Sequence, residues 1–207
     1  MDNYPFNTVG LCSEDIDRYN DIYKALKAKF NIELTGHIDF HLEQFELFKN
    51  YHSVDLLGSF VIKHQNCDSY ILFIQTNYKV TPAKGIGSYY ANECQIWALA
   101  YLKKDFGRVL IRRETLTDKI IELIHPVELD FAEDKAFSDT FYVLVNDHQK
   151  ATNAIDRNFR NAVMDIRKDN FIIEVNEHNL IIGNTGMVSP EKAIYLAEFV
   201  SRVASSC

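Results

Sequence analysis

Residues 141–182 show the clearest pattern of hydrophobic and polar positions in the chain. A short apolar run, 141–145, predicts a β-strand, and an amphipathic segment, 148–166, follows it. Asn146 or Asp147 can cap the first turn of a helix there. We therefore expect one helix that packs its apolar side on a sheet begun at Phe141. The hydrophobic positions recur at steps of three and four: Ala151, Ala154, Ile155, Phe159, Ala162, Val163 and Ile166.

Two further apolar runs, 171–175 and 180–182, come after this helix. They flank residues 176–179, where asparagine stands at both ends. Asparagine tolerates the left-handed backbone angles that a tight reversal requires. The pattern predicts a β-hairpin with a four-residue loop.

Helices are also expected at both ends of the chain. Near the start, Ser13 can cap a helix whose hydrophobic residues keep helical spacing as far as Phe30. Near the end, Ser189 is a capping residue, Pro190 suits the first helical position and Glu191 suits the first turn. Both patterns predict helices that pack by one face.

Between residues 33 and 113 the hydrophobic period changes to that of β-strands. Polar and apolar residues alternate from His37 to Glu43, as in a strand with one buried face. Turn-rich stretches separate the candidates, and short connections favour antiparallel pairing. A meander of about five strands is expected. The further strand candidates are 45–48, 56–64, 70–80, 89–102 and 108–113.

The fold class predicted from these elements is α+β. Residues 1–125 should form an amino-terminal helix with a mostly antiparallel sheet, and residues 126–207 a strand-helix-hairpin-helix unit. The boundary follows a short helix expected over 115–124, which Pro126 would end. The two parts are expected either as subdomains or as parts of one shared core.

Composition and charge narrow the classes of partner. The chain has 207 residues, 47% of them hydrophobic, which is enough for a substantial core. A net charge of -7 argues against duplex nucleic acid and against anionic membrane surfaces as partners. The apolar runs are far shorter than the roughly 20 residues of a membrane helix, so no membrane insertion is predicted. Residues 1–4 lack the pattern of a secretory signal, and a cytoplasmic location is expected.

No sequence motif predicts a bound cofactor. Gly85 and Gly87 lack the third glycine of a dinucleotide-binding loop. The fragments 61–63 and 105–107 resemble pieces of a protein kinase, but the glycine loop and catalytic loop of that family are missing. The cysteines include no C-x-x-C pair, so we expect free thiols and no zinc finger. They are Cys12, Cys67, Cys94 and Cys207.

Four residues of the alternating stretch are candidate metal ligands: His37, Asp39, His41 and Glu43. A strand would direct all four to one side, about 6 to 7 Å apart. Imidazole nitrogens and carboxylate oxygens are ligands of zinc. A solvated strand face explains the same alternation, and ligands usually converge from more than one element. Both interpretations stay open.

A local basic cluster lies between residues 103 and 113. An anion or an acidic partner could bind there. Alternatively, the cluster is a solvated hairpin end that pairs internally with the acidic stretch 128–139. Its members are Lys103, Lys104, Arg108, Arg112 and Arg113.

A series of short motifs runs along residues 54–182. In order, they are Leu57-Gly58 before a strand, Gln75-Thr76-Asn77-Tyr78 in the next strand, Arg113-Glu114, and Phe137 with Phe141-Tyr142-Val143 leading to Asp147. The series resembles a family of uncharacterised bacterial proteins, a domain of unknown function. In that family a β-rich globular domain commonly follows membrane helices. The resemblance implies a fold, and it implies no activity or catalytic residue.

Well-formed elements without a catalytic motif favour a non-enzymatic binding or protein-interaction module with a protein partner. The alternative is a metal-dependent or small-molecule enzyme that uses the face formed by residues 37–43.

Overall fold

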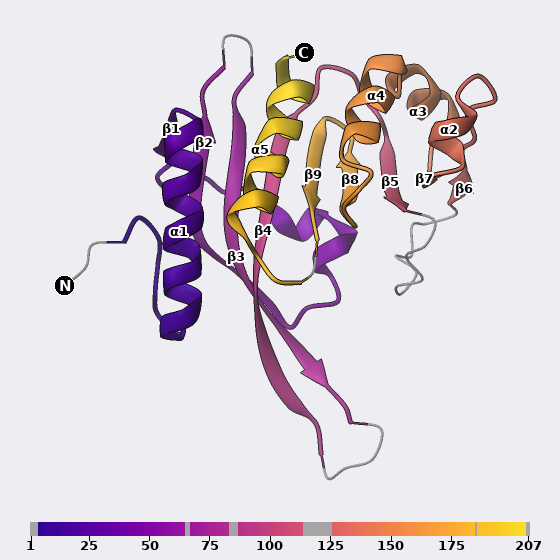
Figure 1. Cartoon of the computed structure of the whole chain (residues 1–207). Helices are drawn as coiled ribbons and strands as arrows, with labels where there is room; N and C mark the ends of the chain where they lie inside the picture. Colours follow the sequence, from indigo (N-terminus) through magenta and orange to yellow (C-terminus); the bar gives the residue numbers. More distant parts are fainter. Residues whose placement is uncertain (1–3, 65–66, 83–86, 114–125, 185, 206–207) are drawn as a thin grey trace.

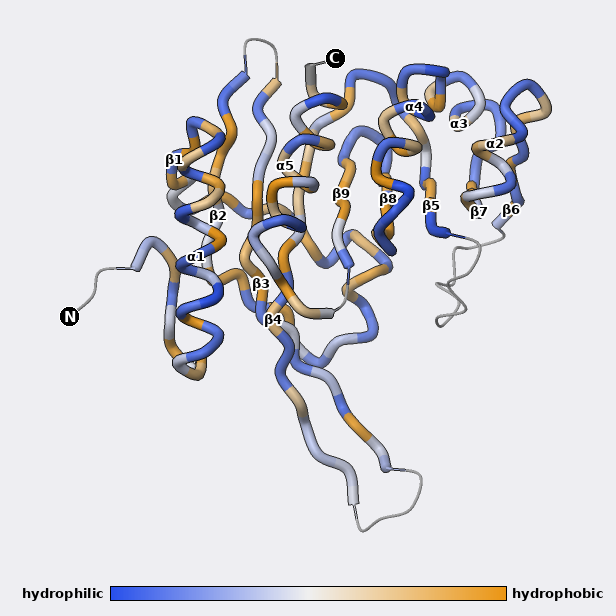
Figure 2. The backbone as a smooth tube through the Cα atoms, viewed as in Figure 1, coloured by the Kyte–Doolittle hydropathy of each residue, from blue (hydrophilic) through white to orange (hydrophobic). Residues whose placement is uncertain are grey.

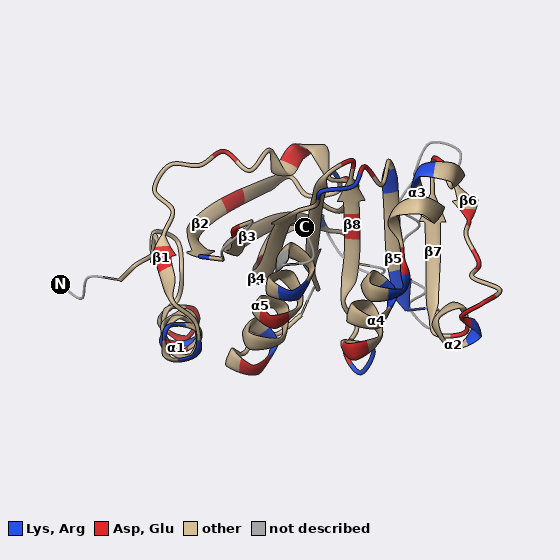
Figure 3. Ribbon diagram, turned by 90° about the horizontal axis from the view of Figure 1, so that it is seen from above, with Lys and Arg blue, Asp and Glu red and all other residues tan. Residues whose placement is uncertain are grey.

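The computed structural model describes residues 4–64, 67–82, 87–113, 126–184 and 186–205. A sheet of nine strands forms the body of the molecule, and neighbouring strands pair antiparallel throughout. Helices lie along one face of the sheet, and residues 35–52 cover part of the other (Figures 1 and 3). The predicted α+β class with a mostly antiparallel sheet is confirmed.

The order of the strands across the sheet is β1-β2-β3-β4-β9-β8-β5-β7-β6. The meander expected over about five strands is confirmed only in part. Strands β2, β3 and β4 pair in sequence, but the β8–β9 hairpin is inserted between β4 and β5. Strands from before and after residues 114–125 therefore alternate in one sheet. The strands are β1 Ile32–Leu34, β2 Ser53–Ile62, β3 Ser69–Val80, β4 Tyr89–Tyr101, β5 Arg108–Arg113, β6 Val127–Glu128, β7 Phe141–Val145, β8 Ile172–Asn176 and β9 Asn179–Gly183.

The two terminal helices are confirmed as α1 and α5. Ser189 caps α5, because its hydroxyl accepts the backbone N–H of Lys192 at 3.3 Å. At α1 the cap residue is Cys12 rather than Ser13. The helix expected over 115–124 and the boundary near residue 125 lie outside the described residues. The helices are α1 Ser13–Lys29, α2 Lys135–Ser138, α3 His148–Ala154, α4 Arg157–Asp165 and α5 Pro190–Ser205, with 3-10 turns η1 Leu42–Gln44 and η2 Glu46–Phe48.

The single helix expected over 148–166 is wrong, because the chain forms two helices there, α3 and α4. The backbone of Asp156 is extended, and its carboxylate accepts the N–H of Phe159 at 3.0 Å, which caps α4. Ala151 and Ala162 are both buried, so the two helices still pack their apolar sides on the sheet. The hydrophobic spacing continues across the break, so it could not reveal the break. The break arises because the carboxylate of Asp156 binds a backbone N–H, and this does not alter the spacing of the hydrophobic residues.

The β8–β9 hairpin is confirmed, with a loop shorter than expected. Asn176 pairs with Asn179, which leaves Glu177 and His178 as the turn. Glu177 has a left-handed backbone with φ of 57°. The left-handed residue is thus a glutamate, where the sequence suggested an asparagine.

No strand forms over residues 37–43 or 45–48, and both of these predictions are wrong. The backbone turns at His41, which has φ of 49°, and η1 and η2 follow. We call residues 35–52 the covering segment, because its aromatic side chains cover the face of the sheet opposite the helices. Its Phe40, Phe45 and Phe48 pack in one cluster with Leu72, Ile74, Trp97, Leu99 and Ile181 of the sheet.

The main hydrophobic core lies between the helices and the sheet. It includes Ile22 of α1, Phe73 of β3, Val175 of β8 and Val200 of α5, all fully buried. Figure 2 shows the hydrophobic residues running along the strands in the middle of the sheet. Both parts of the chain contribute to this core. Among the helices that the structure describes, none is long and apolar enough to cross a membrane.

Candidate functional site

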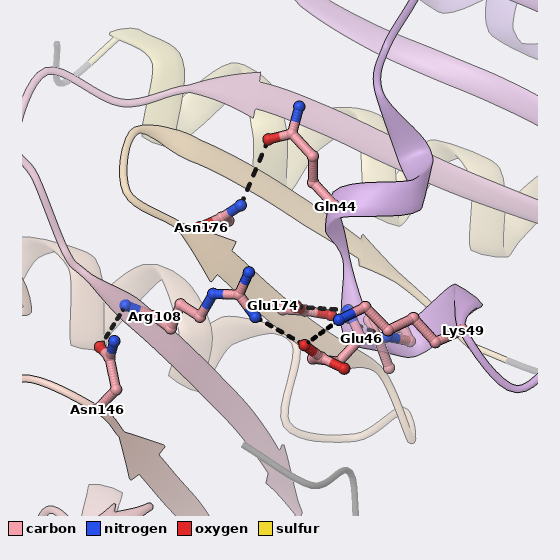
Figure 4. Close-up of polar contacts among 8 residues, drawn as sticks. Gln44, Glu46, Lys49, Arg108, Asn146, Glu174 and Asn176 are labelled. Carbon is pink, nitrogen blue, oxygen red and sulfur yellow. Dashed lines mark hydrogen bonds and ion pairs between the residues drawn. The ribbon is translucent and has the colours of Figure 1, made fainter. Parts of the chain in front are cut away.

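A buried carboxylate on the sheet holds the covering segment in place. Glu174 of β8 is 1% exposed, and its two oxygens accept the backbone N–H groups of Glu46 at 2.8 Å and Leu47 at 3.0 Å (Figure 4). These N–H groups begin the short turn η2, where a helical segment has no internal acceptor for them. Burial raises the pKa of Glu174, and the two backbone hydrogen bonds oppose that rise.

A second carboxylate, that of Glu46, joins the covering segment to β5. It lies 2.7 Å from Nη1 of Arg108 and 2.5 Å from Nζ of Lys49. Partial burial would raise the pKa of Glu46, but the hydrogen bonds from Lys49 and Arg108 outweigh it and hold the pKa below its usual range. Asn176 of β8 adds a hydrogen bond to Gln44 at 3.4 Å (Figure 4).

Each charged group of this cluster has a partner within it. Glu174 uses both oxygens on backbone N–H groups, and Arg108 is paired with Glu46. A general base needs a free acceptor toward its substrate. The cluster therefore positions the covering segment on β8 and β5.

The anchored segment borders a hollow of about 310 Å³ at the start of β2. Tyr51 is held in this wall by Gln95, whose Nε2 donates to the tyrosine oxygen at 3.1 Å. Burial raises the pKa of Tyr51, so the hydroxyl keeps its proton. The walls combine apolar Leu42, Phe48, Tyr51 and Val54 with polar Glu43, Lys49, His52 and Ser53. Such a mixture can hold a ligand by contact area and orient it by hydrogen bonds.

Strands β3 and β4 extend beyond the rest of the sheet as a two-stranded projection (Figure 1). The pairing of β2 with β3 ends at Asn77, so we call residues 78–82 and 87–91 the arm. Tyr89 and Tyr90 of the arm are 57% and 55% exposed. The ring of Tyr90 lies 4.8 Å from that of His52, between ring centroids, which joins the arm to the wall of the hollow.

The structure brings together three of the four candidate metal ligands. The ligand atoms of Asp39, His41 and Glu43 all lie within 4.8 Å of one another, and all three side chains are exposed. The turn at His41 creates this proximity, in place of the expected strand. His37 is not a member of the group. Metal binding there stays a prediction.

The five basic candidates lie on different parts of β5 and the loop before it. Lys103 and Lys104 are exposed in the loop, and Lys104 pairs with Asp156 at 2.8 Å. Arg108 binds Glu46, and the guanidinium of Arg112 lies 5.0 Å from the ring centroid of Tyr142. Alternation along the strand directs Arg113 to the opposite face. Lys104 and Arg108 thus pair with acids other than those of 128–139, and partner contact by the cluster stays a prediction.

Sequence reasoning missed Glu174 and the arm. Glu174 is the one charged residue in the apolar run 171–175, and a lone carboxylate in a buried strand requires hydrogen-bond partners. For the arm, the signal was the length of the strands predicted over 70–80 and 89–102, which exceeds the usual five to six residues.

Comparisons with known proteins give a fold. No family model and no curated protein matches the sequence. A crystal structure of the mycobacterial trehalose monomycolate transport factor A, TtfA, matches with a TM-score of 0.57 and 9% sequence identity. The match covers 89% of this chain and 91% of that chain. At this identity the likeness shows that the two chains share a fold.

Proposed function

We propose that this protein is a non-enzymatic protein-interaction module that holds a partner with the arm and the hollow beside it. The arm carries the proposal, because it places two exposed tyrosines, Tyr89 and Tyr90, on strands that project past the rest of the sheet. Tyrosine offers a large contact area with a polar tip and is enriched at protein interfaces.

The cluster around Glu174 supports this proposal through rigidity. It fixes the backbone of η2, and η2 forms one wall of the hollow. A surface that is already ordered loses less conformational entropy when a partner binds. The fold shared with transport factor A also favours binding over catalysis, since that protein is named for transport and not for a reaction.

Affinity capture with matched baits tests the proposal. The Tyr89→Ser/Tyr90→Ser variant should lose partners that wild-type bait retains, because contact area is lost at the arm. Tyr195→Ser is the control, since Tyr195 is 45% exposed on α5. An unchanged partner list for a double variant with a wild-type melting temperature would contradict the proposal.

The second candidate is a metal-dependent role for Asp39, His41 and Glu43, favoured by the proximity of their ligand atoms. Zinc titration followed by calorimetry should then show saturable binding that His41→Ala removes. His148→Ala alters an exposed histidine on α3 and should bind zinc as wild type does. Equal heats for wild type and His41→Ala would exclude this group as the site.

A further inference from the structure

Strand β4 has an edge that is only partly paired. β3 lies beside it from Tyr89 to Ala100, in a register without a shift. On the other side, β9 pairs only with Trp97–Tyr101. Within the described ranges, no strand lies beside residues 89–96 on that side. No described strand therefore fills, at the other end of β4, the position that β9 fills at this end, and we call this side of residues 89–96 the open side.

The backbone groups of this edge point outward in a regular way. The N–H of Leu102 donates to the carbonyl of His178 at 2.6 Å, on the side of the β8–β9 hairpin. Backbone groups of an antiparallel strand point alternately to either neighbour. The N–H and C=O groups of Tyr90, Asn92 and Cys94 therefore point to the open side.

We propose that an extended segment of a partner protein adds to this edge as a further strand, in line with β9. The inference rests on the proposed function and names the form of the partner. Addition of a strand supplies main-chain hydrogen bonds at each outward residue. Natural sheets protect their edges with charged side chains, above all lysine, and with proline or bulges. Residues 89–96 contain no lysine, proline or bulge, and their one charged residue is Glu93.

The charge of the edge defines the chemistry of the added segment. Glu93 lies in the middle of the edge, and its Oε2 accepts a hydrogen bond from Gln95 at 3.0 Å. Among the described residues no cation forms an ion pair with it. An added strand with Lys or Arg beside Glu93 would supply that pair, in a protein of net charge -7. The occupant is thus an extended, basic segment of another protein.

Random peptides displayed on phage provide the probe. Peptides selected on the wild-type chain should be synthesised and their affinity measured for variants at Asn92. Asn92→Pro removes the outward N–H of residue 92 and should weaken peptide binding about tenfold. This factor corresponds to the loss of roughly one hydrogen bond, together with some displacement of the neighbouring hydrogen bonds. Asn92→Ala is the matched control, since it also removes the side-chain bond to Asn77 (2.7 Å) but keeps the N–H. Its affinity should stay within about twofold of wild type.

Charge and main-chain pairing have separate readouts. Glu93→Gln should lower the affinity for the selected basic peptides a few-fold at low salt, and the difference from wild type should vanish at high salt.

Hydrogen exchange on the complex of the wild-type protein with a selected peptide tests the main-chain pairing without a variant. The amides of Tyr90, Asn92 and Cys94 should become protected when the peptide binds, because they acquire acceptors.

Several results would overturn the inference. They are the selection of no binding peptide, unchanged exchange at the three amides, or equal affinity of folded Asn92→Pro and wild type. Self-association of the wild type that Asn92→Pro abolishes would assign the edge to a second copy of the chain instead. Peptides that bind Asn92→Pro but not Tyr89→Ser/Tyr90→Ser would leave the proposed function intact and reject the edge alone.

Discussion

Glu174 combines nearly complete burial with two backbone hydrogen bonds, and its raised pKa gives stability a defined pH dependence. Above the ordinary pKa of about 4.5, the folded state binds more protons at this site than the unfolded state. Stability from this group is therefore present at low pH and is lost as pH rises through the raised pKa.

Glu174→Gln should remove this part of the pH dependence, because the amide stays neutral. Urea unfolding from about pH 4 to about pH 7 should show the variant gaining stability relative to wild type as pH rises. The amide also offers one acceptor oxygen for two N–H groups, a constant cost of about 1–3 kcal/mol. Parallel stability curves for the two proteins would refute the assignment.

Two glycines with left-handed backbones allow the cost of backbone strain to be measured with and without steric crowding. Gly36 and Gly107 have left-handed φ of 70° and 66°. A Cβ at Gly36 would meet nothing within 4 Å, whereas at Gly107 it would lie 2.9 Å from Oδ1 of Asn146. That oxygen accepts the N–H of Arg108 at 2.7 Å, so its displacement would break a hydrogen bond.

Gly36→Ala should cost about 1–2 kcal/mol of unfolding free energy, the price of a left-handed alanine. Gly107→Ala should cost about 1–3 kcal/mol more, because crowding is added to the same backbone strain. Denaturant unfolding of both variants measures the difference. Equal losses would show that Asn146 moves aside freely.

At the scale of elements, the break between α3 and α4 depends on Asp156. Asp156→Ala should destabilise the protein by about 1 kcal/mol, because the first turn of α4 loses its cap. Asp156→Asn keeps a capping oxygen and removes the charge that pairs with Lys104, and should stay within about 0.5 kcal/mol of wild type. Thermal unfolding compares them, and equal losses would place the effect in the ion pair with Lys104.

Elements with a strong period could be predicted from the sequence. The terminal helices, the long strands β3 and β4 and the β8–β9 hairpin follow from hydrophobic spacing and turn residues. The covering segment could not be predicted, because its alternation of Ile38, Phe40 and Leu42 fits a strand equally well. The left-handed turn at His41 decides between the two structures. Histidine adopts left-handed angles more often than most residues, but still too rarely for its presence alone to predict a turn.

At the scale of the whole molecule, β5 depends on both parts of the chain. It lies between β8 and β7, which come later in the sequence. A fragment of residues 1–113 would leave β5 without either neighbour and would expose the apolar residues of β4 that face α5. We expect this fragment to lack a cooperative unfolding transition by near-ultraviolet circular dichroism, while the full chain shows one. A folded fragment would show that the parts are independent.

The order of the strands could not be read from the sequence. Local patterns predict each strand, but the pairs β4–β9 and β5–β8 join residues that are far apart in the sequence. Trp97 pairs with Gly183, and Arg108 pairs with Asn176. Such contacts depend on which edges remain after local hairpins form. The hydrogen bonds of Glu174 with the backbone of Glu46 and Leu47 depend on the same long-range pairing of strands. The anchoring of the covering segment therefore could not be predicted from the sequence either.

The sequence contains a single tryptophan, Trp97, and it lies under the covering segment. Its ring meets that of Phe48 edge-on at 5.0 Å, and its indole N–H donates to Gln95 at 2.8 Å. Release of η2 from the sheet would wet the indole and shift its emission to longer wavelength. The unlabelled protein thus carries its own optical reporter of whether that segment is docked.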